Sequence, residues 1–252
     1  MSTTAIILLI LLFFVTTAIG VVTGSNSLVT VPVMFQFGFE PKVAVATNMF
    51  GLTFMAVGAS IPFLRRGTVS VKRLSPLIFL TLIGSCLGAL LVGWISDKTI
   101  PIIVSVSMII VAIFTLLKRD AGVTKSEAIS PKTLLIAYIL TFFLGIYGGL
   151  YSGGYVTILT TVFVAFLGMT FSEAVAGTKI VNVFSSAIAT IIFMWQGLVD
   201  YRTGIILAVT MFIGAYMGAH FVTKLNDVWL KRIFLTTVFI LAVKTILDFT
   251  LK

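Results

Sequence analysis

The sequence predicts an all-α protein that crosses a membrane several times. Of its 252 residues, 59% are hydrophobic and only 10% are charged, and the mean hydropathy is +1.19. A soluble domain of this size needs a polar coat, and 17 basic and 8 acidic residues cannot supply one. Apolar runs near the length of a membrane-spanning helix predict about eight net crossings. These runs cover residues 4–38, 43–64, 74–96, 100–117, 133–168, 174–196, 203–222 and 230–249.

Two of these runs, 4–38 and 133–168, are too long for one simple crossing and rather short for two. Each is interrupted by small and polar residues, GVVTGSNSLVTVP at 20–32 and GGLYSGGYVT at 148–157. Backbone groups inside a bilayer need hydrogen-bond partners, so such breaks are tolerated only where protein or a wet cavity covers them. We therefore expect the first helix of each half to be broken or partly re-entrant.

The basic residues predict the orientation. If each long run crosses once, most cations lie on one side of the membrane. Because cations favour the cytoplasmic side, we expect an inner-membrane protein with both termini in the cytoplasm. A full hairpin in the first run would move the RRGTVSVKR loop outside, against this bias. The net charge of +9 therefore reflects topology, and no nucleic-acid partner is expected. The cations on the predicted inner side are Arg65, Arg66, Lys72, Arg73, Lys118, Arg119, Lys125, Lys132, Arg202 and Lys252, against Lys42, Lys98, Lys224, Lys231 and Arg232.

The two halves of the chain repeat each other. Three motifs recur in the same order and at a nearly constant spacing, which indicates duplication. The matching pairs are AVATN with AVAGTK, RRGTVSVKR with WQGLVDYR, and GSCLGALLVGWISD with GAYMGAHFVTKLND. The spaced glycines of the last pair predict close helix packing. We divide the chain into a first repeat at 1–117, a cytoplasmic linker at 118–132 and a second repeat at 133–252. Four crossings in each repeat would give both copies one orientation.

The two interruptions form a candidate anion site. A broken helix exposes N-terminal N–H groups whose positive dipole end attracts anions, and transporters bind substrates at paired breaks of this kind. A kink that serves only packing is the alternative. Lys179 is costly inside the membrane unless it faces an anion, reaches the interface or pairs with Glu173. The candidate substrate-binding residues are Gly24, Ser25, Asn26, Ser27, Thr47, Asn48, Ser152, Gly153, Gly154, Tyr155, Thr178 and Lys179.

In the order of its motifs, the sequence resembles the sulfite exporter TauE/SafE family of bacterial and archaeal inner-membrane anion transporters. That family repeats a Gly-rich break, an AV-A/G-T-S motif, a G-x-V-D loop and a G-xxx-G-A helix, and the match extends over most of the chain. The resemblance implies export of sulfite or a small organosulfur anion such as a sulfonate, driven by the proton gradient. Two departures leave another oxyanion open: SNS at 25–27 replaces three glycines, and Asn48 and Lys179 replace a serine.

Other functions are less well supported by the sequence. Cys86 and His220 are each unique, so no metal cluster or cofactor is predicted, and no nucleotide-binding GxxxxGK[ST] motif is present. An intramembrane enzyme would have to use Ser152 or Cys86 with His220, and no nucleophile motif surrounds them. A passive anion channel, which would carry anions without proton coupling, remains an alternative. So does a membrane assembly subunit that transports nothing. The expected partners are thus a small sulfur-containing anion, protons and the lipid bilayer.

Overall fold

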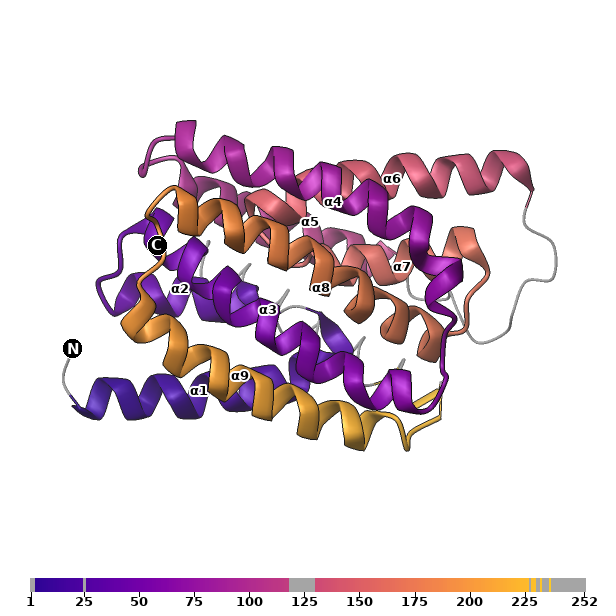
Figure 1. Cartoon of the computed structure of the whole chain (residues 1–252), viewed down its shortest axis with the longest axis horizontal. Helices are drawn as coiled ribbons and strands as arrows, with labels where there is room; N and C mark the ends of the chain where they lie inside the picture. Colours follow the sequence, from indigo (N-terminus) through magenta and orange to yellow (C-terminus); the bar gives the residue numbers. More distant parts are fainter. Residues whose placement is uncertain are drawn as a thin grey trace.

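A computed structural model describes residues 3–24, 26–117 and 130–226, together with positions 228, 229, 232 and 236. These ranges are helical and contain no strand, which confirms the all-α prediction (Figure 1). The helices are α1 (Thr3–Thr23), α2 (Ser27–Gln36), α3 (Pro41–Arg65), α4 (Val71–Trp94), α5 (Ile100–Leu117), α6 (Pro131–Leu150), α7 (Tyr155–Leu167), α8 (Phe171–Trp195) and α9 (Tyr201–Val222). The predicted crossing at 230–249 and most of the linker lie outside the described residues.

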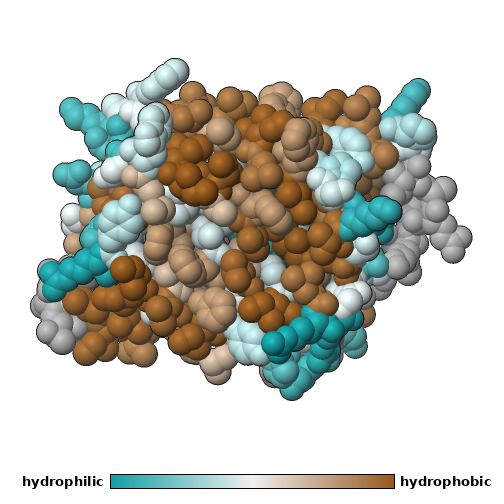
Figure 2. Space-filling view, viewed as in Figure 1, coloured by the Kyte–Doolittle hydropathy of each residue, from teal (hydrophilic) through white to brown (hydrophobic). Residues whose placement is uncertain are grey.

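The surface of the bundle is that of a polytopic membrane protein. Six of the described helices, α1, α3, α4, α6, α8 and α9, are long and apolar enough to cross a bilayer. Figure 2 shows apolar residues along the sides of the bundle and hydrophilic residues gathered at its two ends. This distribution matches a hydrocarbon layer around the middle of the helices and water at both ends.

Left-handed glycines recur at the spacing of the sequence repeat. Each lies at a turn where φ is positive, a backbone conformation that residues other than glycine rarely adopt. The corresponding pairs are Gly24 (φ 68°) with Gly154 (78°), Gly38 (83°) with Gly168 (59°), and Gly67 (61°) with Gly197 (69°). α3 and α8 are both 25 residues long, and their first residues, Pro41 and Phe171, stand at the same spacing as these glycines. The same backbone frame is therefore built twice.

Helices of one repeat pack in parallel on helices of the other. Gly204 near the start of α9 lies against Phe50 of α3, and Gly58 further along α3 lies against Phe212, so α3 and α9 run in one direction. The same holds for α4 and α8. In that pair Gly177 contacts Leu74 near the two starts, and further along the amide of Gln196, just after α8, donates to the carbonyl of Ala89.

The two repeats run in opposite directions, so the predicted parallel orientation is wrong. The short loop at 66–70 joins α3 to α4 as an antiparallel pair, and the Lys42 Nζ at the start of α3 donates to the Gly93 carbonyl near the end of α4 (3.4 Å). Because α8 is parallel to α4, it is antiparallel to α3 (Figure 1). The copies are related as inverted repeats, whose pseudo-twofold axis lies in the membrane plane.

The cause of this inversion is that each long apolar run doubles back. α1 is parallel to α9 and hence to α3, because Gly214 lies against Phe14 and Gly218 against Ala18. α2 returns alongside α3 in the opposite direction, and α6 and α7 repeat this arrangement beside α4 and α8 (Figure 1). The α1–α2 and α6–α7 hairpins are thus re-entrant. Each hairpin ends on the side of the bundle where it begins, so neither adds a net crossing to those of the described helices.

The spaced glycines pack as predicted. Gly84 and Gly88 of α4 lie against the backbone of α6, and Gly88 leaves no room for a side chain beside the Ile146 carbonyl. Gly214 and Gly218 of α9 lie in the same way against α1. Small residues let the helix backbones approach closely where apolar burial provides no driving force between helices. Each re-entrant hairpin is therefore held by a glycine-bearing helix of the other repeat.

Candidate functional site

The tips of the two hairpins meet in the interior of the bundle. The hydroxyl of Ser27, at the start of α2, lies 2.8 Å from the hydroxyl of Ser152 in the α6–α7 turn. The Tyr151 hydroxyl donates to the Ser27 carbonyl (2.9 Å), and the Thr157 hydroxyl donates to the Thr23 carbonyl (2.7 Å). All five side chains are buried. The two interruptions, which lie in different halves of the sequence, are therefore in direct contact.

A chain of hydrogen bonds links this contact to α3 of the first repeat. The Asn48 amide of α3 donates from Nδ2 to the Ser27 hydroxyl (2.8 Å), and its Oδ1 accepts from the Thr30 hydroxyl (2.7 Å). Thr30, Asn48, Ser27 and Ser152 thus form one buried polar line. Buried polar groups in a membrane interior carry a cost unless they are paired, so the pairing within this line stabilises the tips.

The second repeat contains a shorter version of the same line. The Thr160 and Thr178 hydroxyls lie 3.2 Å apart, and Thr178 also donates to the Val175 carbonyl (3.0 Å). The Thr160–Thr178 pair corresponds to Thr30–Asn48 at the spacing of the repeat. Thr178 is therefore the counterpart of Asn48, but its hydroxyl bonds Thr160 and the Val175 carbonyl and not the hairpin tip.

Lys179 is the buried cation beside these tips. It is only 2% exposed, and its Nζ donates to the carbonyl of Gly20 (3.1 Å) in the last turn of α1. A cation at a helix C-terminus satisfies an end carbonyl and complements the negative end of the helix dipole. Lys179 therefore does not reach the interface. Glu173 caps the start of α8 in a reciprocal bond pair with Thr170.

The N-terminal ends of α2 and α7 point toward each other at the tips. α2 follows Asn26, which makes no side-chain cap, and α7 follows Gly154, which has no side chain to make one. Asn26 is 4% exposed, and neither Oδ1 nor Nδ2 has a partner among the described residues. Its Cβ lies 3.2 Å from the position that a Cβ on Gly20 would take, close to the carbonyl that Lys179 bonds. Two uncapped helix starts and one unpaired amide provide donors for an anion.

Glycines allow the two tips to approach. A Cβ on Gly24 would lie 2.7 Å from the Cβ of Val156 and 3.0 Å from the Thr157 nitrogen, in addition to the strain of its positive φ. A Cβ on Gly153 would enter the Tyr151 ring, and the Gly153 carbonyl accepts from the Tyr147 hydroxyl. Gly24 therefore allows the two hairpins to approach each other, and Gly153 allows the α6–α7 turn to fold against Tyr151.

Two predicted site residues, Thr47 and Tyr155, stand apart from this cluster, and a third has no described position. The Thr47 hydroxyl accepts from the backbone N–H of Asp200 (3.0 Å), in the loop before α9. The Tyr155 ring lies over Gly148, and its buried hydroxyl has no hydrogen-bond partner among the described residues. Ser25 lies outside the described residues. Conversely, Thr30 belongs to the cluster and was not predicted.

Comparison with known proteins finds one matching family model and several similar membrane proteins. A family model described as Sulfite exporter TauE/SafE matches residues 8–245. The chain is similar to the probable membrane transporter protein YfcA of Escherichia coli (strain K12), with 27% identity over 245 residues that cover 96% of this chain and 91% of that protein. It is also similar to the probable membrane transporter protein ORF9 of Sinorhizobium sp (26%; 93% and 90%) and to one from Haemophilus influenzae (25%; 93% and 92%). No solved structure matches it.

Proposed function

Because the chain belongs to the sulfite exporter TauE/SafE family of membrane proteins, we propose that it is a secondary transporter that exports sulfite or a related small organosulfur anion. The observation that supports this best is the meeting of the two hairpin tips. There, two helix starts without a side-chain cap lie beside the amide of Asn26, which has no partner among the residues that the structure describes.

The chemistry of the tips suits a small oxyanion. Sulfite and sulfonate groups carry several acceptor oxygens around one sulfur, and they need several donors arranged around a small volume. Ser27 and Ser152 bond each other in this structure, and both hydroxyls can turn toward an anion placed between the tips. The ammonium group of Lys179, a residue of α8, lies at the end of α1. It supplies the positive charge that balances a bound anion in the absence of water.

The arrangement of the repeats favours a transporter over a passive channel. An open channel needs a continuous path, whereas here the two tips touch through Ser27 and Ser152. Inverted repeats allow two states of similar energy in which the hairpins exchange conformations, so that a central site opens to each side in turn. Coupling to protons is part of the proposal, and transport driven by an imposed pH gradient across proteoliposomes tests it.

The charges, placed on this topology, orient the protein in the cytoplasmic membrane. The end of the bundle that contains the 66–70 loop and the start of α6, which we call the linker end, carries more cations than the opposite end. We place the linker end in the cytoplasm. The start of α1 then lies outside, because the α1–α2 hairpin makes no net crossing. At the linker end are Arg65, Arg66, Lys72, Arg73, Lys132 and Lys224, and at the opposite end are Lys42, Lys98 and Arg202.

Ligand-dependent thermal stability tests the proposed site directly. Sulfite, a short alkyl sulfonate, sulfate and chloride are added in turn to the purified protein, and the melting temperature is recorded. An anion at 100 times its Kd stabilises the folded state by about 2.7 kcal/mol. We expect sulfite or the sulfonate to raise the melting temperature of the wild type, and Asn26→Leu and Ser152→Ala to reduce the shift. A shift that is the same in both variants would place the anion elsewhere.

A further inference from the structure

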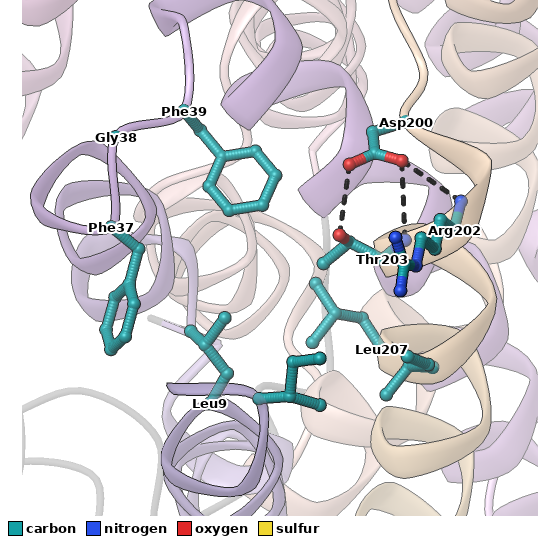
Figure 3. A pocket seen from close by; sticks show the side chains of 10 residues that line it. Leu9, Phe37, Gly38, Phe39, Asp200, Arg202, Thr203 and Leu207 are labelled. Atoms are coloured by element: carbon teal, nitrogen blue, oxygen red, sulfur yellow. Dashed lines mark hydrogen bonds between the residues drawn. The ribbon is translucent and has the colours of Figure 1, made fainter. Parts of the chain in front are cut away.

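A crevice opens at the end of the bundle opposite the linker. It lies between α1, the turn that joins α2 to α3, and the start of α9, and it has a volume of about 280 Å³ (Figure 3). Figure 3 shows Phe37 and Phe39 on one side and Asp200, Arg202 and Thr203 facing them. The remaining lining is aliphatic or glycine. The lining residues are Ile6, Leu9, Phe37, Gly38, Phe39, Asp200, Arg202, Thr203, Ile206 and Leu207.

The free polar group of this crevice is the Arg202 guanidinium. The Asp200 carboxylate is already occupied as the cap of α9, because it accepts from the backbone N–H groups of Arg202 (3.0 Å) and Thr203 (3.4 Å) and from the Thr203 hydroxyl (3.0 Å). No described residue accepts a hydrogen bond from the Arg202 side chain. The crevice therefore combines one available cation with two aromatic rings, which fits an anion that carries a small apolar part.

The crevice is close to the buried polar line. The N–H of Asp200, in the crevice wall, donates to the hydroxyl of Thr47 (3.0 Å), and Thr47 directly precedes Asn48 on α3. Leu207, which also lines the crevice, packs near Gly51 one turn further along α3. The crevice wall is therefore in direct contact with the part of α3 that carries Asn48.

The equivalent place at the linker end is closed. At the spacing of the repeat, Phe37 and Phe39 correspond to Leu167 and Met169, which are 4% and 1% exposed, whereas the two phenylalanines are half-buried. Arg73 donates from Nη2 to the Leu167 carbonyl (2.8 Å), at the point where α7 ends. The inverted repeats thus differ in state, with an open crevice at one end and a bonded, packed counterpart at the other.

We propose that this crevice is a second binding position for the substrate, the outer vestibule of the transport path. Arg202 binds the sulfonate or sulfite group there, and Phe37 and Phe39 contact the carbon part of an organic sulfonate. The Arg73–Leu167 bond closes the corresponding vestibule at the linker end in this state. The inference rests on the proposed function and adds to it a substrate class, small organic sulfonates with an apolar part, and a direction of opening.

Transport kinetics of Arg202 variants test the vestibule. Proteoliposomes containing wild type, Arg202→Lys, Arg202→Gln or the control Lys98→Gln are assayed with a short alkyl sulfonate. Lys98 is an exposed cation at the same end of the bundle that does not line the crevice. We expect Arg202→Gln to raise the half-saturating concentration about fivefold and Arg202→Lys to restore part of it. Equal values for Arg202→Gln and Lys98→Gln overturn the vestibule. If Asn26→Leu still reduces thermal stabilisation by the anion, the proposed function stands.

Thiol labelling tests the difference between the two ends. Phe39→Cys and Met169→Cys are introduced into protein whose Cys86 is replaced by alanine, and both are treated with a membrane-impermeant thiol reagent added from both sides. We expect Phe39→Cys to react at least tenfold faster and to be protected by the alkyl sulfonate. Equal rates overturn the inference. Protection that depends on phosphatidylglycerol instead of the soluble sulfonate, compared in vesicles of phosphatidylcholine with and without it, assigns the crevice to lipid phosphate and also overturns it.

Discussion

The two hairpins share a glycine with positive φ at their turns and differ in their side chains. Gly24 and Gly154 both have a positive φ, yet Asn48 bonds Ser27 at the tip of its hairpin, whereas its counterpart Thr178 bonds Thr160 within α7. Lys179 has Met49 as its counterpart. The difference indicates a division of roles. We propose that Asn48 of the first repeat adds an amide donor at the tips and that Lys179 of the second repeat adds the cation. The predictions below break or sharpen this comparison, beginning with the largest expected effect.

Gly24→Ala tests how strongly the shared backbone frame is needed at the tips. A methyl group at this position suffers the positive φ and also meets Val156 of the other hairpin, so we expect the free energy of unfolding to fall by about 3 kcal/mol. Gly38→Ala is the matched control, because its φ is also positive and no atom lies within 4 Å of the added Cβ. It should cost about 1 kcal/mol. Thermal unfolding in detergent measures both, and equal losses would mean that the tips do not pack closely.

Lys179→Met gives the second repeat the residue that the first repeat has at the equivalent position, Met49. The substitution removes the balancing charge while it keeps the length of the side chain, so we expect anion transport to fall about 100-fold, equivalent to about 2.7 kcal/mol. The melting temperature without ligand should stay the same or rise, because replacing a buried charge with an apolar side chain is often neutral or stabilising. Sulfite transport in inverted vesicles, compared with Met49→Leu as control, checks this. Unchanged transport would remove Lys179 from the site.

Asn48→Thr makes the first repeat like the second at the polar line. It removes the bond from Nδ2 to Ser27, so we expect the apparent affinity for the anion to fall about tenfold. Thr178→Ser keeps a hydroxyl at the counterpart position and should change the affinity less than twofold. Initial transport rates at several anion concentrations separate affinity from maximal rate. A larger effect of Thr178→Ser than of Asn48→Thr would reverse the division of roles.

Arg73→Thr makes the linker end like the open end, because threonine is the residue at the corresponding position 203. The loss of the bond to the Leu167 carbonyl should favour opening at the linker end by about 1 kcal/mol. We expect a thiol at position 169, introduced as Met169→Cys, to react about fivefold faster in this background. Lys72→Thr serves as the control and should leave the rate unchanged. No acceleration would show that other contacts hold this end closed.

The sequence predicted some features of the fold because their signal is local. Composition indicates the membrane helices, and the Gly/Ser breaks indicate where α1 and α6 end. Thr30 was missed because it lies in an apolar stretch, SLVTVPVMFQ. Its available signal was its separation from Asn48 along the chain, which Thr160 and Thr178 repeat.

The direction of the second repeat could not be predicted in the same way. The charge bias fits two topologies, which differ in whether residues 4–38 cross or double back. That choice depends on contacts between residues far apart in sequence, such as Ser27 with Ser152 and Thr157 with Thr23. Pattern and composition do not reveal such contacts. These contacts decide whether each long run doubles back as a hairpin.

The exchange of partners between the halves also affects how the protein is made. The glycine groove of α4 accepts α6, and that of α9 accepts α1. While the ribosome completes the first repeat, Gly84 and Gly88 therefore have no partner helix, and α1 packs against its glycine-bearing partner only after α9 has been synthesised. Neither half is a complete folding unit, so a protein cut within the linker should recover its fold only when both fragments are synthesised in the same membrane.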